Sequence, residues 1–182
     1  MGARKLIRVL GAVLVVSLSA GCSGSDDDAS TSPIAGGEAP DVEAPAFVTA
    51  VREAMAAVED ELGGPQRYFE VTSNAQFTNV FVAVDDATAT VAYAYVDGEL
   101  QPPAPKQDGA SGNTFAATDV DFVDDRILSG ATADLSDSEI DAISVYGDGV
   151  GATYVLAASS SAGGFLDIVV GPDGTVFSVD PV

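Results

Sequence analysis

The sequence contains few side chains that could carry out chemistry, and most of them are carboxylates. The chain has no histidine, which excludes Ser-His-Asp and Cys-His catalysis and histidine-ligated metal sites. Its one cysteine, Cys22, lies just after an apolar N-terminal run. Lys106 lies in a proline- and glycine-rich stretch, a poor place to desolvate an amine into a nucleophile. We therefore predict no catalytic residue, no cofactor and a protein that is not an enzyme.

The densest group of carboxylates is the segment TDVDFVDD, which holds Asp119, Asp121, Asp124 and Asp125. Calcium binds six or more oxygens, so these four residues are weak candidates for a metal site. The segment lacks the Asp-x-Asp-x-Asp-Gly spacing and the closing Glu of an EF-hand loop. The same carboxylates could form a glycosidase acid–base pair, but the chain has no Trp for a sugar platform. We interpret the segment as a solvated turn and predict no metal.

Two other patterns have a functional and a structural interpretation. YGDGVGA (146–152) resembles a dinucleotide-binding glycine pattern, but a strand-like run follows it where a helix is needed. Its glycines are better explained as the end of a helix and the start of a strand. Tyr93 and Tyr95 share one face of a predicted strand and are expected to cover the core, with a binding patch as the alternative.

The N-terminus has the three parts of a secretory signal peptide. Three cations occur within residues 1–8, an apolar run follows at 9–18, and small residues occupy 19–21. The apolar run is about ten residues long, whereas a membrane-spanning helix needs roughly 20. We therefore predict export and cleavage before Cys22.

Cys22 and the residues before it resemble the lipobox of bacterial lipoproteins. In that family the cysteine sulfur receives a diacylglyceryl group, and fatty acyl chains then hold the protein at the membrane. The usual Leu three positions before the cysteine is replaced by Ser19, with Leu18 one place further back. The resemblance implies a lipidation site at Cys22 and a location on the extracytoplasmic face of the cell membrane. The alternatives are an ordinary signal peptide or a buried apolar N-terminus.

The predicted mature chain, residues 22–182, is strongly acidic. It keeps four cations against 28 carboxylates, a formal charge of −24. Such a surface repels nucleic acid and anionic lipid headgroups, so neither is an expected partner. A basic protein, a cation or a polyamine remains electrostatically compatible, and selection for solubility or salt tolerance is the simpler explanation.

The periodicity predicts an acidic tether followed by two similar halves. Residues 1–21 are the signal peptide and 22–44 the flexible tether. The first half (45–100) contains a helix at 46–62 and strand-like runs at 67–73, 78–84 and 88–96. Residues 101–118 are a predicted linker. In the second half (119–182), Ser136 and Glu139 fit a capping box that starts a helix ending at Gly147, before strands at 152–160, 165–171 and 175–179.

Corresponding landmarks in the two halves lie 84 to 86 residues apart, which suggests an internal duplication. We therefore predict an α+β fold of two tandem helix-strand-strand-strand units, with antiparallel sheet and helices packed on one face. Low identity between the halves leaves chance alternation as the alternative.

Two stretches, VAYAYVDGELQPP (91–103) and DIVVGPDGTVFSV (167–179), give the chain a distant resemblance to tandem α/β repeat lipoproteins. PepSY domains and tandem-repeat protease or lactamase inhibitors are similar in the same way. The resemblance implies a non-enzymatic binding or inhibitory module with an extracytoplasmic protein partner. A carrier of a lipid or other apolar ligand between the repeats, or an acidic cation-binding module, are the alternatives.

Overall fold

A computed structural model describes residues 44–135, 137–161 and 163–182 of the chain. The predicted signal peptide, lipidation site and most of the tether lie outside the described residues, as does Ser136 of the predicted capping box. None of the helices in these ranges has the length and the apolar composition that a membrane-spanning helix requires.

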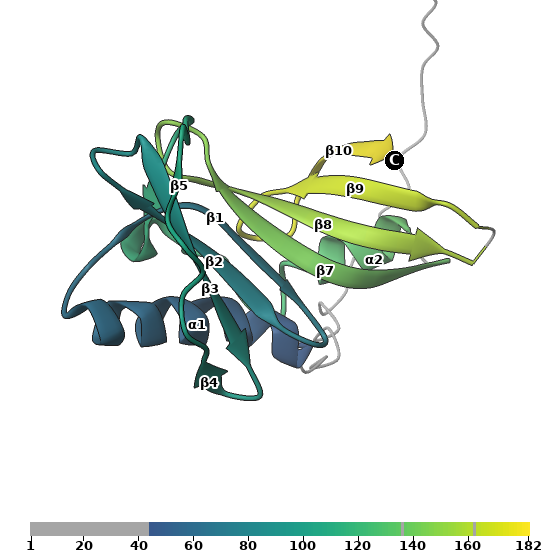
Figure 1. Cartoon of the computed structure of the whole chain (residues 1–182). Coiled ribbons are helices and arrows are strands. Elements are labelled where there is room, and N and C mark those ends of the chain that lie inside the picture. Colours follow the sequence, from purple (N-terminus) through teal and green to yellow (C-terminus); the bar gives the residue numbers. More distant parts are fainter. Residues whose placement is uncertain (1–43, 136, 162) are drawn as a thin grey trace, which may run out of the picture. The chain divides into compact units, whose positions relative to one another are not determined.

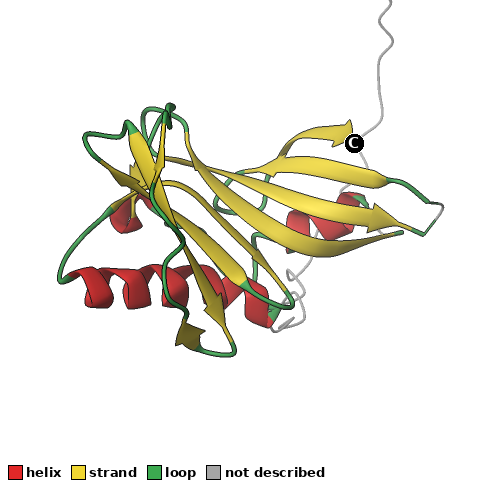
Figure 2. Ribbon diagram, viewed as in Figure 1, coloured by secondary structure: helices red, strands yellow, loops and turns green. Residues whose placement is uncertain are grey.

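The described chain is dominated by β-structure (Figures 1 and 2). The elements of its first part are α1 (Ala46–Leu62), β1 (Arg67–Asn74), β2 (Thr78–Val84), β3 (Ala89–Val96), β4 (Glu99–Leu100), β5 (Gln107–Asp108) and β6 (Phe115–Ala116). The second part contains the 3-10 turn η1 (Ala117–Asp119), α2 (Ser129–Asp134), β7 (Ser138–Gly147), β8 (Ala152–Ser160), β9 (Phe165–Val170) and β10 (Val176–Pro181).

The predicted first helix is confirmed as α1. Its apolar stripe recurs every three or four residues and is buried, including Val51, Met55 and Val58. Gly63 ends the helix in the left-handed conformation, with φ 76°, and its N–H donates to the carbonyl oxygen of Asp60. The stripe packs against β1 and β2, so α1 covers one face of that part of the sheet (Figure 1).

The ten strands of the described residues belong to one antiparallel sheet. Eight of them follow the order β10-β9-β8-β7-β1-β2-β3-β4, while β5 pairs with β3 and β6 pairs with β1. Strands β1 and β7 pair at the centre, with Val71 opposite Val145, and join two meanders. One face of the sheet carries a single core that includes the buried residues Tyr68, Val80, Ile143, Leu156 and Ile168. Pairing between residues far apart in the sequence therefore makes the two halves one body.

The predicted fold class is wrong. The described chain is a β-rich body built on one large sheet, and α1 is its only helix longer than six residues. The second predicted unit contains four strands, because the segment predicted as its helix is the long strand β7. The offset of 84 to 86 residues matches β1 with β8 and leaves β7 without a counterpart. Two equivalent helix-strand-strand-strand units are therefore absent from the described residues.

A β-bulge explains why β7 was mistaken for a helix. Ile140 pairs with Ala158 and Ala142 pairs with Ala157, so Asp141 is an extra residue in the ladder. The bulge reverses the alternation of the strand, and Ile140 and Ile143 both face the core three residues apart. Apolar residues three positions apart normally indicate a helix.

The predicted linker runs along the sheet for much of its length. The segment Glu99–Gly109 follows β3 as an interrupted strand, with N–H groups of Gln101, Ala104 and Gly109 donating to carbonyl oxygens of β3 or of Thr88 just before it. Pro102, Pro103 and Pro105 have no N–H to offer on the outer side. The segment therefore covers the β3 edge of the sheet and presents few donors for a further strand.

Candidate functional site

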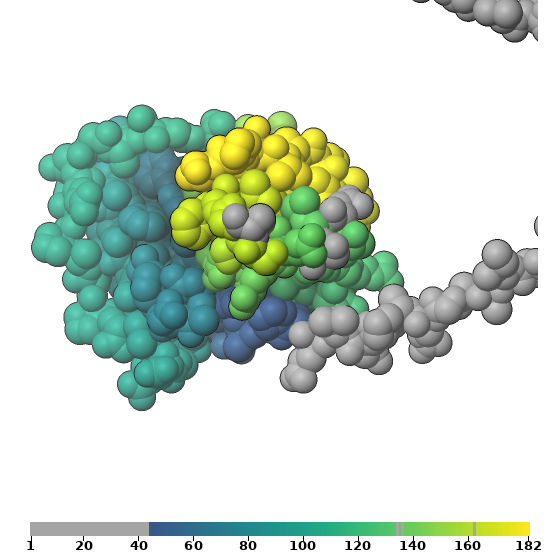
Figure 3. Space-filling view, turned by 90° about the vertical axis from the view of Figure 1, so that its right-hand side faces the viewer, coloured from purple at the N-terminus to yellow at the C-terminus, as the bar shows by residue number. Residues whose placement is uncertain are grey.

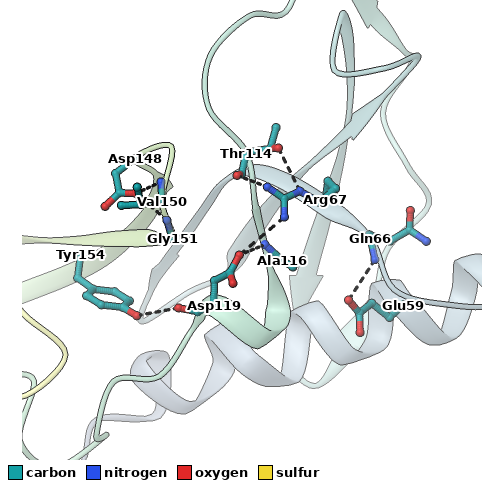
Figure 4. Close-up of polar contacts among 10 residues, drawn as sticks. All are labelled: Glu59, Gln66, Arg67, Thr114, Ala116, Asp119, Asp148, Val150, Gly151 and Tyr154. Carbon is teal, nitrogen blue, oxygen red and sulfur yellow. Dashed lines mark hydrogen bonds and ion pairs between the residues drawn. The ribbon is translucent and has the colours of Figure 1, made fainter.

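Three of the four aspartates of TDVDFVDD contact different parts of the fold. The carboxylate of Asp119 accepts the Ala116 N–H at 2.8 Å and lies 3.8 Å from the guanidinium of Arg67 (Figure 4). Arg67 also donates to the hydroxyl and carbonyl oxygens of Thr114. Asp119 therefore fastens the segment to the start of β1.

Asp121 contacts Tyr154 of β8. The Tyr154 hydroxyl donates to the Asp121 carboxylate at 3.0 Å and accepts the Asp121 N–H at 3.2 Å. Burial, with the Asp121 carboxylate nearby, raises the pKa of Tyr154 to about 12. This tyrosine therefore stays protonated and holds the acidic segment against the sheet.

Asp124 is paired with Arg52 of α1. The Arg52 guanidinium also donates to the carbonyl oxygen of Phe122 and lies 4.1 Å from the centroid of the Phe122 ring. The ring of Phe122 in turn meets that of Tyr154 edge-on at 5.3 Å. One arginine thus connects the first helix to the acidic segment.

The structure does not gather the four aspartates into a metal centre. Within the described part of the chain, no group of three or more His, Cys, Asp or Glu side chains could hold an ion. Calcium needs several oxygens converging on one point, and these carboxylates contact different elements. No observation supports the calcium alternative.

Asp124 and Asp125 do lie together on the wall of a cleft of about 440 Å³ beside the start of α1. The cleft lies among α1, the acidic segment, α2 and the beginning of β7. Its apolar lining is formed by Phe47, Leu128 and Ile140. Its polar lining is formed by the carboxylates Asp124, Asp125 and Glu139 and the hydroxyl residues Ser129, Thr132 and Ser138.

The charge in this cleft is unevenly compensated. Asp124 is neutralised by Arg52, whereas Asp125 and Glu139 form no ion pair among the described residues. Both of the latter residues are exposed. The cleft therefore combines an apolar surface with two carboxylates that are open to a cation.

The remaining candidates from the sequence lie elsewhere. YGDGVGA spans the turn between β7 and β8, where the Asp148 carboxylate accepts the N–H groups of Val150 and Gly151 at 2.8 and 2.7 Å (Figure 4). These bonds lower the pKa of Asp148. A helix is missing at that turn, so it has no dinucleotide geometry.

Tyr93 is buried in the core and Tyr95 is partly buried against it, as expected. Tyr95 also lines a second cleft of about 540 Å³ on the other side of the α1 N-terminus, together with Phe77. Lys106 donates to Asp85 at 2.5 Å and contacts Asp108 at 3.2 Å, and hydrogen bonds to these carboxylates raise its pKa. Its amine is therefore held in the cationic form.

Sequence reasoning missed most of the cleft. The sequence places Phe47 in the first predicted helix, Glu139 in a capping box and Ile140 in the second predicted helix. It places Leu128 in no element. The positions of Leu128 and Ile140 in the sequence do not indicate that they line the same cleft as Phe47. Only the acidic segment provided a local signal, and two of its four members line the cleft.

Comparison with protein-family models, curated proteins and solved structures finds no match to this chain.

Proposed function

We propose that this chain is a non-enzymatic binding module, held by a lipid on Cys22 at the extracytoplasmic face of a bacterial membrane. Its ligand is a small organic cation that carries an apolar group, or a protein side chain of that kind. The observation that carries the proposal is the cleft in which Phe47, Leu128 and Ile140 lie beside Asp125 and Glu139.

The apolar lining of the cleft favours the apolar group of such a ligand, and the carboxylates favour its cationic group. An apolar group that fills the space against Phe47, Leu128 and Ile140 gains about 25 cal/mol for each Å² of apolar surface removed from water. An ammonium or guanidinium group beside an exposed carboxylate gains about 0.2–1 kcal/mol. The apolar contact therefore supplies most of the affinity, and the carboxylates supply the preference for a cation.

The anchoring part of the proposal is supported by the sequence alone. A basic start, a short apolar run and small residues precede Cys22, which is the pattern of a lipoprotein signal. The chain that follows Cys22 joins the described body at Ala44, and Ala44 itself lines the cleft. One wall of the proposed binding site thus begins 22 residues after the predicted anchor in the sequence.

The geometry favours this function over the carrier alternative. A carrier would hold its ligand between the two halves of the chain. The β1–β7 ladder joins those halves directly, and buried side chains of both halves form one core cluster. The cleft beside α1, rather than the junction of the halves, is therefore the site that we propose.

The proposal is tested by calorimetric titration of the full chain carrying Cys22→Ala, which removes the lipid acceptor. Phenethylammonium is the probe, and 3-phenylpropionate and 2-phenylethanol are its anionic and neutral counterparts. We expect the cation to bind most tightly. The double variant Asp125→Asn/Glu139→Gln should weaken cation binding several-fold and abolish the preference over the alcohol.

Glu61→Gln is the matched control, because Glu61 is an exposed carboxylate at the far end of α1. It should leave the cation affinity unchanged. Equal affinity for the cation and the anion would contradict the proposed function, as would equal losses in the double variant and the control.

A further inference from the structure

Among the described residues, nothing pairs with the outer side of strand β10, which is an edge of the sheet. It pairs with β9 on one side and ends the strand order, so no described strand lies on its other side. Figure 3 shows the C-terminal residues, in yellow, along the upper margin of the face turned toward the viewer. The opposite edge, at β3, is covered by the proline-containing segment Glu99–Gly109. The described chain therefore covers the β3 edge of the sheet but not the β10 edge.

The hydrogen-bond pattern identifies the backbone groups that point away from the sheet. The Val182 N–H donates to the carbonyl oxygen of Phe165 at 3.0 Å, and Asp180 lies opposite Asp167 in the same register. Antiparallel ladders alternate, so Asp180 is directed toward β9 while Val179 directs its N–H and C=O outward. Val179 is thus ready to exchange two hydrogen bonds with an additional strand.

Apolar side chains are exposed along this edge. On β10, Phe177 is 70% exposed and Val179 39%, and Phe165 at the start of the neighbouring β9 is 65% exposed. From Thr175 to Val179 the sequence TVFSV carries no charge and is rich in residues that favour strands. Natural sheets usually protect such an edge with charged residues, proline or a covering segment. In the part of the chain that the structure describes, Asp180 and Pro181, at the end of the strand, are the only such protection of this edge.

Asp167 and Asp180 form a like-charge pair across β9 and β10. Like charges directly opposite one another destabilise an antiparallel ladder. Asp180 accepts a hydrogen bond from the Ser178 hydroxyl at 3.2 Å, but no cation pairs with either carboxylate among the described residues. A cation on a further strand beside Asp180 would relieve this repulsion.

We propose that β10 binds an extended basic segment of another protein as an added antiparallel strand. A Lys or Arg of the segment lies beside Asp180, and the residues on either side of it are apolar. The residue opposite Val179 exchanges two backbone hydrogen bonds with it, and its side chain packs on Val179. Backbone pairing supplies the affinity and Asp180 supplies the charge preference.

Charge favours a basic segment over a second copy of this chain. Six of the 28 carboxylates precede residue 44, which leaves 22 against four cations in the described range. Two such bodies repel each other, and the edge carries no cation to offset that repulsion. The edge and the cleft are separate sites, so this inference goes beyond the proposed function.

The test uses two capped eight-residue peptides of alternating threonine and valine, one with a central arginine and one with a central glutamate. Each is titrated into the full chain carrying Cys22→Ala, and amide resonances are followed by NMR. We expect the arginine peptide to bind about threefold more tightly than the glutamate peptide. Its binding should protect the Val179 amide from hydrogen exchange.

Val179→Pro removes the outward N–H without removing a hydrogen bond to β9, and it should abolish binding while the melting temperature stays the same. Val179→Thr keeps the N–H and the branched shape, so binding should persist. Asp180→Lys should reverse the preference between the two peptides. The cleft variant Asp125→Asn/Glu139→Gln should bind the arginine peptide as tightly as the parent.

Three results would overturn the inference. They are equal binding of the two peptides, retention of binding by Val179→Pro, and peptide-induced shifts centred on the cleft. Sedimentation that showed a dimer of the chain alone, lost in Val179→Pro, would identify a second copy as the occupant and contradict the basic partner.

Discussion

Arg52 on α1 forms an ion pair with Asp124, and these two residues connect the first helix to the acidic segment 72 residues later in the sequence. The same guanidinium donates to the carbonyl oxygen of Phe122 and lies over its ring. The acidic segment is therefore held at one wall of the cleft by a cation from another element.

Replacement of Arg52 by Met should destabilise the fold by about 1–3 kcal/mol, because the ion pair, a charged hydrogen bond and a cation–π contact are lost. Urea unfolding measures the difference. Arg126→Met is the control, since Arg126 is exposed and forms no ion pair among the described residues. A loss in Arg52→Met no larger than that in the control would contradict the proposed connection.

The free energy of unfolding should fall as the pH rises from about 10 through 12. Burial raises the pKa of both Tyr68 and Tyr154, and that of Tyr154 reaches about 12, whereas an unfolded tyrosine titrates near 10. The folded state therefore binds more protons than the unfolded state above pH 10. The free energy of unfolding that these tyrosines contribute is lost as the pH rises further. Denaturant unfolding between about pH 10 and 12 measures how steeply the free energy of unfolding falls with pH.

Tyr154→Phe provides the matched comparison, because it removes the titrating hydroxyl and keeps the ring against Phe122. Its stability should depend less on pH above 10. At neutral pH the variant should be about 1 kcal/mol less stable, because the Asp121 N–H loses its acceptor. Identical slopes for parent and variant would show that Tyr154 is not a source of the alkaline transition.

Gly130→Ala should destabilise the fold by about 1–3 kcal/mol, although alanine favours helices. A Cβ at Gly130 in α2 would lie 1.9 Å from the carbonyl oxygen of Gly174, in the turn before β10. Gly151→Ala is the control, because a Cβ there meets no atom within 4 Å. Thermal unfolding of the two variants gives the comparison, and an unchanged melting temperature for Gly130→Ala would refute the close approach.

Cys22→Ala should move the protein from the membrane fraction to the soluble fraction of the envelope, because it removes the proposed lipid acceptor. Fractionation followed by intact-mass analysis measures both the location and the modification. Retention of the variant in the membrane fraction, or a native protein that keeps residues 1–21, would contradict lipid anchoring.

Local patterns in the sequence predicted α1 and six of the strands to within a few residues. Their signals are contained within each element: a stripe closed by Gly63 for α1, and alternation or turn residues for the strands. The helix predicted after Leu135 failed because the bulge at Asp141 gives a strand the spacing of a helix. A bulge depends on pairing with the partner strand, and the local sequence pattern carries no information about that pairing.

The long-range arrangement could not be predicted from the sequence in the same way. Pairing of Thr72 with Ser144 places β1 beside β7, and this contact decides that the two halves share one sheet. The order of strands also decides that β10 is an edge. For the cleft, the acidic residues are visible in the sequence, but the sheet order decides that Phe47 and Ile140 line the same cleft.

The most direct test of the central claim is an NMR titration of the Cys22→Ala chain with phenethylammonium. We expect the largest shifts at Phe47, Leu128 and Ile140, saturating as the cation fills the cleft, and saturation at a several-fold higher concentration with 3-phenylpropionate. Shifts spread over exposed carboxylates away from the cleft, such as those of Asp85 and Asp86, or equal responses to cation and anion, would contradict a binding site in this cleft.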